Sequence, residues 1–343
     1  MQAVILAGGL GTRMRPLTYT TPKSLLPIMN EPMVERLINT LPKEIDRVVI
    51  AASYMVDRLR EHFKENDIGR KVVIVEEKEP LGTGGAIKNV QKHVDDTFIA
   101  INGDVISSLD YTSMRDFHKD SGGIGTISLW EVKDPTRYGI IGFDSQLKIS
   151  RFLEKPAPKE VFSNWINAGV YILEPEIFNF IEPDKIISIE KEIFPPLASE
   201  GKLFGFKFYG FWVDAGTPEA YLSAHRTLLD KGVSLALSYP YENVRIVPPV
   251  LIGDECWIGE NSEIGPYTCL GNSIEVLSET KITNSVVLGN TLIGRSNHLK
   301  EVIIGYGCTI EDEVTMGSGV VVGDNQILKK GTTVPDNSTM GEM

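Results

Sequence analysis

Cysteine is scarce in this chain of 343 residues, and long hydrophobic runs are missing from it. The three cysteines, Cys256, Cys269 and Cys308, are odd in number, far apart and never in a C-x-x-C pair, which argues against disulfides or a zinc site. No apolar run reaches the ~18 residues of a membrane span, and no charged-then-apolar leader precedes a cleavage site. We therefore expect a soluble, cytoplasmic protein that does not bind a membrane.

Basic residues are also few, with 34 lysines and arginines against 46 aspartates and glutamates and a net charge of −12. Because affinity for nucleic acids comes from clustered Lys and Arg, this balance argues against nucleic-acid binding. The first 30 residues reverse the balance, since they contain Arg13, Arg15 and Lys23 but no Asp or Glu. A local excess of positive charge in an acidic chain predicts a site for an anionic ligand.

The basic stretch contains a glycine-rich loop that follows the apolar run 3–6. Gly8, Gly9 and Gly11 leave the backbone open there, so main-chain N–H groups can close around an anion. The spacing lacks the G-x-x-x-x-G-K-[ST] of a P-loop and the G-x-G-x-x-G of a dinucleotide fold, so neither an ATPase nor a dehydrogenase is indicated. The structural alternative is a tight turn.

Apolar patterns divide the chain into two domains. Within residues 1–232, buried strands alternate with helical patterns of about 10–15 residues, which predicts a Rossmann-like α/β domain with a mixed, mostly parallel sheet. The expected helices are 32–41, 55–64, 86–94, 188–195 (stopped by Pro195) and 219–229, and the first expected strands are 3–6, 48–52, 72–75 and 98–101. Residues 233–247 are expected to be a linker.

Residues 248–343 carry an aliphatic residue every six positions, often followed by glycine, as at Ile252, Ile258, Ile264 and Leu270. A hexapeptide repeat of this kind predicts an all-β, left-handed parallel β-helix. The phase breaks over residues 289–304, where we expect a loop inserted between coils, with His298 in it. The five histidines lie outside every motif and are expected to be surface or packing residues.

Two aspartates follow buried strands of the first domain: Asp104 in I-N-G-D and Asp214 in W-V-D-A-G-T-P. In parallel α/β sheets, ligands bind beyond the carboxyl ends of the strands. Mg²⁺ prefers one or two carboxylates together with phosphate oxygens and water, so this pair is a candidate magnesium site. For either residue alone, a turn or cap role is the alternative.

The string G-G-x-G-T-R-x-R-P-L-T, with P-K-S-L-L-P after it, resembles the nucleotide-binding motif of the sugar-1-phosphate nucleotidylyltransferases. These enzymes convert an NTP and a sugar 1-phosphate into an NDP-sugar and pyrophosphate. Their N-G-D and W-x-D-x-G-x-P motifs hold the metal, which implies Mg²⁺ as the cofactor and Asp104 and Asp214 as its ligands. Y-G at 138–139, F-x-E-K-P at 152–156 and N-A-G-x-Y at 167–171 resemble the segments that bind the sugar phosphate.

The resemblance implies a role for each matching residue. Arg13 would bind the β- and γ-phosphates, Lys23 a phosphate near the reacting centre, and Lys155 the attacking sugar phosphate; these three are the catalytic candidates. The nucleotide-binding candidates are Leu6, Ala7, Gly8, Gly9, Gly11, Thr12, Arg13, Lys23, Gly103 and Asp104, with Glu77 and Gly82 from the base-binding loop E-K-E-P-L-G-T-G-G-A. The sugar-phosphate candidates are Gly139, Glu154, Lys155 and Asn167.

Substrate choice is implied by three further strings. I-S-I-E-K-E-I-F-P, F-W-V-D-A-G-T-P and E-P-L-G-T-G-G-A are similar to segments of mannose-1-phosphate guanylyltransferases, which implies GTP and mannose 1-phosphate as substrates. One alternative is a glucose-1-phosphate thymidylyl- or uridylyltransferase of the same family. Another is a non-catalytic regulatory or scaffold subunit, although such a subunit is expected to have lost the loop cations or the carboxylates. We expect homo-oligomer contacts through the β-helix.

Overall fold

The computed structural model describes residues 1–232 and 242–341, which form two compact units. One unit comprises Met1–Leu10 and Val34–Trp212, and the other comprises Gly11–Met33 and Val213–Met343. The basic segment Gly11–Met33 thus clusters with the C-terminal part of the chain, whereas Gly8 and Gly9 belong to the first unit. Most of the predicted linker, residues 233–241, lies outside the described residues, and the predicted domain boundaries remain predictions. Among the described residues, no helix is long and apolar enough to cross a membrane.

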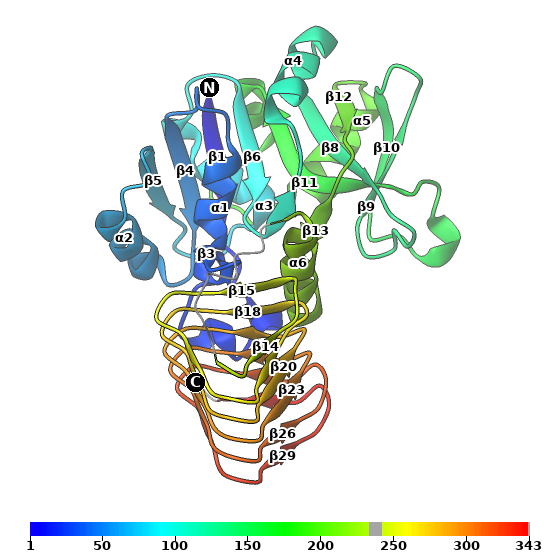
Figure 1. Ribbon diagram of the computed structural model, residues 1–343. Coiled ribbons are helices and arrows are strands. Elements are labelled where there is room, and N and C mark those ends of the chain that lie inside the picture. The colour runs from blue at the N-terminus through cyan, green and yellow to red at the C-terminus, as the bar shows by residue number, and fades with distance from the viewer. Residues whose placement is uncertain (233–241, 342–343) are drawn as a thin grey trace. The chain divides into compact units, whose positions relative to one another are not determined.

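A mixed sheet forms the centre of the first unit (Figure 1). Its strands run in the order β10-β9-β11-β6-β1-β4-β5, and β8 pairs with β11 and β12. Strands β5, β4, β1 and β6 are mutually parallel, whereas β11 is antiparallel to β6, as predicted for a mixed, mostly parallel sheet. The strands are β1 (Gln2–Leu6), β4 (Arg47–Ala52), β5 (Lys71–Glu76), β6 (Phe98–Asn102), β8 (Gly125–Glu131), β9 (Gly139–Phe143), β10 (Ile149–Glu154), β11 (Trp165–Leu173) and β12 (Leu203–Lys207).

Helices connect these strands; α4 was not expected from the sequence, and two of the expected helices differ from their expected bounds by more than one residue. They are α1 (Met33–Thr40), α2 (Val56–Glu65), α3 (Gly82–Asn89), α4 (Tyr111–Ser121), α5 (Phe194–Ser199), the π-helix η7 (Ile189–Ile193) and the 3₁₀ turns η4 (Gln91–His93), η5 (Pro158–Glu160) and η6 (Pro175–Phe180). Helix α3 begins at Gly82 rather than Ala86, so the glycines expected in a loop form its first turns. The helix expected to stop at Pro195 continues to Ser199, because the proline lies in the first turn of α5, where no intrahelical N–H is needed.

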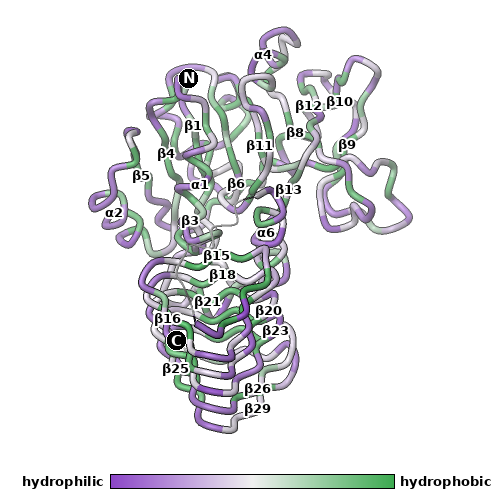
Figure 2. The backbone as a smooth tube through the Cα atoms, viewed as in Figure 1, coloured by the Kyte–Doolittle hydropathy of each residue, from purple (hydrophilic) through white to green (hydrophobic). Residues whose placement is uncertain are grey.

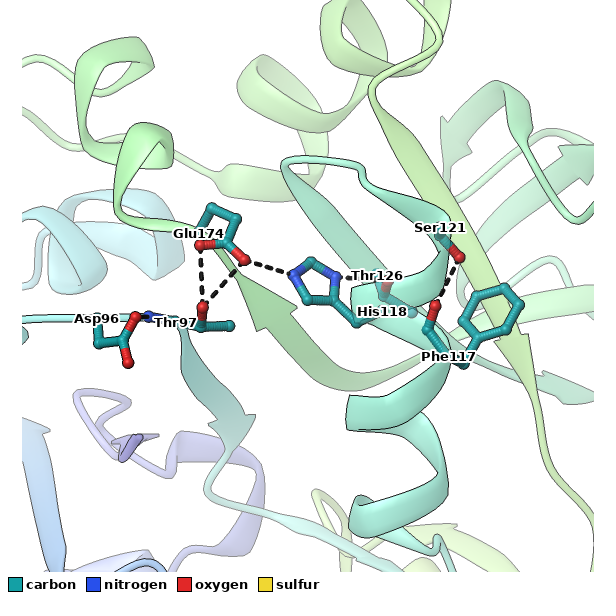
Figure 3. Close-up of polar contacts among 7 residues, drawn as sticks. All are labelled: Asp96, Thr97, Phe117, His118, Ser121, Thr126 and Glu174. Atoms are coloured by element: carbon teal, nitrogen blue, oxygen red, sulfur yellow. Dashed lines mark hydrogen bonds and ion pairs between the residues drawn. The ribbon is translucent and has the colours of Figure 1, made fainter.

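A buried polar network fixes α4 against the sheet (Figure 3). His118 is 2% exposed, and its Nδ1 lies 2.8 Å from Thr126 Oγ1 while its Nε2 lies 3.0 Å from Glu174 Oε1. Thr97 donates to the same carboxylate at 2.9 and 3.0 Å. Because Thr97 precedes β6, this network lies at the opposite end of that strand from Asp104. His118 is therefore a packing residue, as predicted.

Three parallel sheets form most of the second unit (Figure 1), consistent with a left-handed β-helix. Their strand orders are β14-β17-β20-β23-β26-β29, β15-β18-β21-β24-β27-β30 and β16-β19-β22-β25-β28. The strands are β14 (Arg245–Ile246), β15 (Val250–Ile252), β16 (Trp257–Ile258), β17 (Glu263–Ile264), β18 (Thr268–Leu270), β19 (Glu275–Val276), β20 (Lys281–Thr283), β21 (Val286–Val287), β22 (Leu292–Ile293), β23 (His298–Lys300), β24 (Ile303–Ile304), β25 (Thr309–Ile310), β26 (Thr315–Met316), β27 (Val321–Val322), β28 (Ile327–Leu328), β29 (Thr333–Val334) and β30 (Thr339–Met340).

The expected loop at 289–304 is wrong. Cys269 pairs with Val286 and Val286 with Ile303, so these coils are 17 residues long, one residue shorter than the 18 that separate Leu251 from Cys269. Single-residue contractions between coils, not an insertion, therefore break the phase of the repeat. His298 belongs to β23 inside a sheet and not to a loop.

Hydrophilic and hydrophobic residues alternate along the coils of the second unit (Figure 2), and the residues that point outward differ between the three sheets. On the β14–β29 sheet the outward column is polar: Arg245, Glu263, Lys281, His298, Thr315 and Thr333. On the β15–β30 sheet the column is apolar and buried up to its last coil: Leu251, Cys269, Val286, Ile303 and Val321. On the β16–β28 sheet, Trp257 and Ile327 are 52% and 60% exposed. Since core aliphatics of each coil point inward, the buried column must be covered from outside.

The second unit also holds the segment Gly11–Met33 and the helix α6. The segment contains three short 3₁₀ turns and a two-stranded sheet: η1 (Thr12–Met14), η2 (Leu17–Tyr19), η3 (Lys23–Leu25), β2 (Pro27–Ile28) and β3 (Glu31–Pro32). Helix α6 (Pro218–Asp230) follows β13 (Trp212–Asp214), and the Thr217 side chain caps it by accepting from the backbone N–H of Ala220. The short strand β7 (Val105–Ser107) pairs with β13.

Candidate nucleotide and sugar-phosphate site

The carboxyl ends of four parallel strands meet at one edge of the first unit's sheet. Leu6 at the end of β1 pairs with Asn102 at the end of β6, and the backbone N–H of Gly103 donates to Leu6 O at 2.9 Å. On the other side of β1, the Ser53 hydroxyl after β4 donates to Gly8 O. The structure therefore brings the predicted residues Leu6 to Gly9 to the same edge as Gly103 and Asp104, where an α/β sheet binds ligands.

Glu77 follows β5 and lies against the glycine loop. It is 3% exposed, and a Cβ placed on Gly8 would lie 2.7 Å from its Oε1. Its Oε2 accepts from Leu81 N at 2.9 Å, whereas its Oε1 is buried with no hydrogen-bond partner among the described residues. Burial raises the pKa of Glu77, and the Leu81 hydrogen bond offsets this in part. A buried acceptor thus faces the predicted nucleotide loop and lacks a donor.

Glycines at the start of α3 allow a second chain segment to approach it closely. The N–H groups of Gly84 and Gly85 both donate to Ile187 O, at 2.8 and 3.2 Å. A Cβ on Gly82, whose φ is +71°, would lie 2.6 Å from the same oxygen. The string 79–86 is therefore glycine-rich because the backbone around residue 187 packs against it, which is a structural reason for the motif beside any contact with a base.

The predicted sugar-phosphate residues Gly139, Glu154 and Lys155 lie together where β9 and β10 pair. Gly139 is opposite Glu154 in the antiparallel register, and a Cβ on it would lie 2.6 Å from Glu154 Oε2. Lys155 has a φ of +48°, and its N–H donates to Tyr138 O at 3.0 Å. Its exposed ammonium lies 3.9 Å from Glu154 Oε1. A carboxylate, an ammonium and open backbone are thus available to one polar, anionic ligand.

Glu190 is a residue of this region that our sequence reasoning did not select. Its carboxylate accepts from Thr83 Oγ1 at 2.6 Å, from Ser188 Oγ at 2.7 Å and from Tyr171 Oη at 3.3 Å. Burial raises the pKa of Glu154, and the negative charge of Glu190 raises it further. The string I-S-I-E-K contains Glu190, but an acidic side chain in a helical pattern gives no sign that it is enclosed by hydroxyl donors.

Asn167 has a structural function in β11. Its Oδ1 accepts from Gly169 N at 3.0 Å, and its Nδ2 donates to Tyr171 Oη at 2.8 Å. These bonds span an irregularity in the pairing of β11 with β8, at which Gly169 has a φ of +76°. The side chain therefore shapes the strand beside the sugar-phosphate residues, and its direct contact with a ligand remains a prediction.

The second unit contains the remaining candidates, Gly11, Thr12, Arg13, Lys23 and Asp214. A Cβ on Gly216 would lie 2.6 Å from Arg13 Nη2 and 2.8 Å from Asp214 Oδ1, so guanidinium and carboxylate both face this glycine. A Cβ on Gly11, whose φ is +64°, would lie 3.2 Å from Lys23 Cβ. Each glycine thus permits a close approach that a side chain would block. The Asp214 carboxylate offers the kind of oxygen that Mg²⁺ takes as a ligand, and the Arg13 guanidinium offers N–H donors to phosphate oxygens.

Comparison with known proteins agrees with this arrangement. The nucleotidyl transferase family matches residues 2–231, and the GMPPB C-terminal domain matches residues 246–341. The chain therefore belongs to the nucleotidyl transferase family. More narrowly, it is similar to mannose-1-phosphate guanylyltransferases. A probable mannose-1-phosphate guanylyltransferase 1 of Oryza sativa subsp. japonica is 34% identical over 318 residues, covering 90% of this chain and 87% of the relative. The catalytic subunit beta of Xenopus tropicalis is 33% identical with the same coverage.

Two solved structures each cover about two thirds of the chain. HddC from Yersinia pseudotuberculosis complexed with GMP-PN is 33% identical with a TM-score of 0.56, over 66% of this chain and 99% of that one. A putative glucose-1-phosphate thymidylyltransferase from Bacillus anthracis in complex with a sucrose is 25% identical with a TM-score of 0.61, over 69% and 98%. Both support the nucleotidyltransferase fold of the N-terminal part.

Proposed function

We propose that this protein transfers the guanylyl group of GTP to mannose 1-phosphate, giving GDP-mannose and pyrophosphate. The observation that carries the proposal is the edge formed by β5, β4, β1 and β6, where a glycine loop and the buried Oε1 of Glu77 lie together. Guanine presents adjacent N–H donors that such an acceptor can bind, and an unpaired buried acceptor is costly. The similarity to guanylyltransferases over 90% of the chain supports the same choice.

The residues divide the reaction between them. A phosphate oxygen of the sugar phosphate attacks the α-phosphorus, a new P–O bond forms, and the bond to pyrophosphate breaks on the opposite side. Arg13 and Lys23 bind the phosphates of the nucleotide, and Lys155 holds the attacking phosphate. Asp104 and Asp214 are the proposed ligands of Mg²⁺, which when bound neutralises charge on the phosphates. The sugar phosphate is itself an anionic nucleophile, so no covalent enzyme intermediate is needed.

Recognition of the sugar is assigned to Gly139 and Glu154. Glu154 accepts hydrogen bonds from sugar hydroxyls, and Gly139 lets the sugar approach the backbone at the start of β9. The half-buried position of the Glu154 carboxylate, with the charge of Glu190 nearby, supports this assignment, because a partly desolvated acceptor gains more from each hydroxyl donor than an exposed one.

The alternative substrates are glucose 1-phosphate with dTTP or UTP. The similarity to the putative glucose-1-phosphate thymidylyltransferase from Bacillus anthracis is the reason to test them. The deciding experiment measures kcat/KM from pyrophosphate release, with GTP, dTTP, UTP, ATP and CTP each paired with mannose 1-phosphate and glucose 1-phosphate. We expect GTP with mannose 1-phosphate to exceed every other pair. A higher value for dTTP or UTP with glucose 1-phosphate would assign the chain to the other activity, and no release with any pair would favour a non-catalytic subunit.

We also propose that copies of this chain associate through the β-helix. Trp257 and Ile327 are exposed on the outward face of the β16–β28 sheet, and large exposed apolar side chains are typical of interfaces. Light scattering of the wild type should show an oligomer at micromolar concentration, and Trp257→Glu with Ile327→Glu should reduce its mass. A monomeric wild type would contradict the proposal.

A further inference from the structure

The segment Gly11–Met33, which we call the cation segment because it carries Arg13, Arg15 and Lys23, clusters with the β-helix in one compact unit. In Figure 1 its short blue turns lie beside the yellow and orange coils. A phosphate-binding loop in an α/β protein is ordinarily held by the strand before it and the helix after it. The contacts of this segment show a different support.

Its first half rests on the C-terminal coils. A Cβ on Gly323 would lie 3.0 Å from Pro16 Cβ, and one on Gly341 would lie 3.3 Å from the same atom. The Thr20 hydroxyl donates to Asp324 Oδ2 at 2.5 Å. Pro16 and Thr20 lie between Arg13 and Lys23 in the sequence, so the turn that separates the two predicted phosphate ligands is seated on the β-helix.

Its second half contacts the middle of the β-helix. Met29 Sδ lies 3.5 Å from Cys269 Sγ, which belongs to the buried apolar column of the β15–β30 sheet. The side chain of Asn30 donates to Leu270 O at 2.8 Å, and the hydroxyl of Tyr221 in α6 donates to Pro27 O. Both halves of the cation segment therefore contact the β-helix.

Inside the cation segment, hydrogen bonds transmit the position of the seated turn to the cations. Thr18 Oγ1 donates to Gly11 O at 2.9 Å, and Met14 N donates to the same oxygen at 2.8 Å. Leu26 N donates to Lys23 O at 3.1 Å. A shift of the turn 16–20 on the β-helix must therefore move Gly11 and the backbone that bears Arg13.

Asp324 shares its position in the hexapeptide with Asp312 and Asp336, which follow strands of the other two sheets. Asp312, Asp324 and Asp336 each accept a backbone N–H of the preceding coil with Oδ1, at 2.7, 2.8 and 2.9 Å. Among the bonds described for the three, only Asp324 also accepts from the cation segment, through Oδ2. Asp324 therefore makes the bond between coils and also binds Thr20 of the cation segment.

We infer that the β-helix is the support that positions the phosphate-binding cations, with Thr20, Asp324 and Gly323 as positioning residues. The inference rests on the proposed function only in that the cations bind nucleotide phosphates. Removing the Thr20 hydroxyl, or displacing Pro16 with a side chain at Gly323, loosens the cation segment. Nucleotide binding then weakens, while sugar-phosphate binding does not. The β-helix then contributes to phosphate binding through the cation segment.

The test uses the full chain with Thr20→Val, which deletes the hydroxyl at nearly constant volume, and Gly323→Ala, which places a Cβ against Pro16. Thr20→Ser and Asp336→Asn are the matched controls. We expect both test variants to raise the KM for GTP about fivefold, the scale of one lost hydrogen bond, with the KM for mannose 1-phosphate within twofold of wild type and the melting temperature unchanged. Both controls should behave as wild type.

Amide hydrogen exchange of peptides from residues 11–26 provides a readout that needs no activity. We expect exchange to rise at least threefold in Thr20→Val and Gly323→Ala and to stay unchanged in the controls. Unchanged exchange in both test variants overturns the inference, whatever the enzyme does. If exchange increases in the two test variants but the wild type turns over no nucleotide, the β-helix does support the cation segment, and the result contradicts the proposed function instead. Increased exchange with an unchanged KM for GTP overturns the link to nucleotide binding.

Discussion

The cation segment and the sugar-phosphate segment at 138–155 are built in different ways. The sugar-phosphate segment lies where β9 and β10 pair, and Gly139 and Glu154 are opposite each other in register. The cation segment has no long strand of its own, and its contacts run to coils more than 200 residues later in the chain, such as Leu270 and Asp324. The two segments proposed to bind the two substrates therefore have separate supports, and we expect mutations to affect binding of the two substrates separately.

The largest effect is expected where both substrates depend on one group. Asp104→Asn should lower kcat about a thousandfold, because it removes the carboxylate charge proposed to hold Mg²⁺. The melting temperature should not change, since an amide has almost the same shape. Asp96→Asn at the other end of β6 is the control and should retain activity (Figure 3). Wild-type pyrophosphate release from Asp104→Asn would contradict the metal assignment.

The next effect should separate the two segments. Lys155→Gln removes the ammonium proposed to hold the sugar phosphate and should lower kcat/KM for mannose 1-phosphate about a hundredfold. Binding of GTP alone, measured by calorimetry, should stay within twofold. Lys159→Gln, an exposed lysine in the nearby turn η5, is the control. If Lys155→Gln weakens GTP binding as strongly as sugar-phosphate turnover, the two segments are not separate.

A smaller effect is expected from Gly139→Ala. The new Cβ would lie 2.6 Å from Glu154 Oε2, so the carboxylate must move. We expect the KM for mannose 1-phosphate to rise about tenfold. Gly142→Ala on the same strand places its Cβ 3.2 Å from Phe162 Cε2, which can yield, and should change the KM little. Equal effects of the two substitutions would show that β9 is merely sensitive to side chains.

The smallest expected effect concerns stability. Burial, and then Glu190, raise the pKa of Glu154 in the folded protein. A raised pKa means that stability is full below the unfolded value of about 4.3 and is lost as the pH rises through the folded value. The melting temperature of Glu154→Gln should therefore be about 1–2 °C above that of wild type at pH 7. At pH 4 the two melting temperatures should be the same. Glu131→Gln, at an exposed position, is the control. A lower melting temperature of Glu154→Gln at pH 7 would contradict this cause of the shift.

Apolar runs that alternate with helical patterns, together with the six-residue repeat, were enough to predict the sheet, the β-helix and the strand edge with Gly8, Gly103 and Asp104. These features depend on local spacing, which one sequence displays. The start of α3 at Gly82 was missed because glycine usually indicates a turn, whereas here it makes room for the backbone at Ile187. The break in the hexapeptide phase was read as an insertion, although contractions by one residue preserve every sheet.

Long-range contacts account for the rest. Glu190 is surrounded by Thr83, Ser188 and Tyr171, two of which are distant in the sequence. The bond from Thr20 to Asp324 joins the two ends of the chain. No local pattern distinguishes Asp324 from Asp312 or Asp336, because all three satisfy the same bond between coils. Partners of this kind become visible only when the chain is folded.

The most direct test of separate supports measures the KM for GTP and the KM for mannose 1-phosphate side by side in Thr20→Val and Glu154→Gln. The account predicts that Thr20→Val raises only the KM for GTP, because it loosens the cation segment on the β-helix. It predicts that Glu154→Gln raises only the KM for mannose 1-phosphate, because the carboxylate accepts from the sugar. A change of both constants by the same factor in either variant would contradict the account.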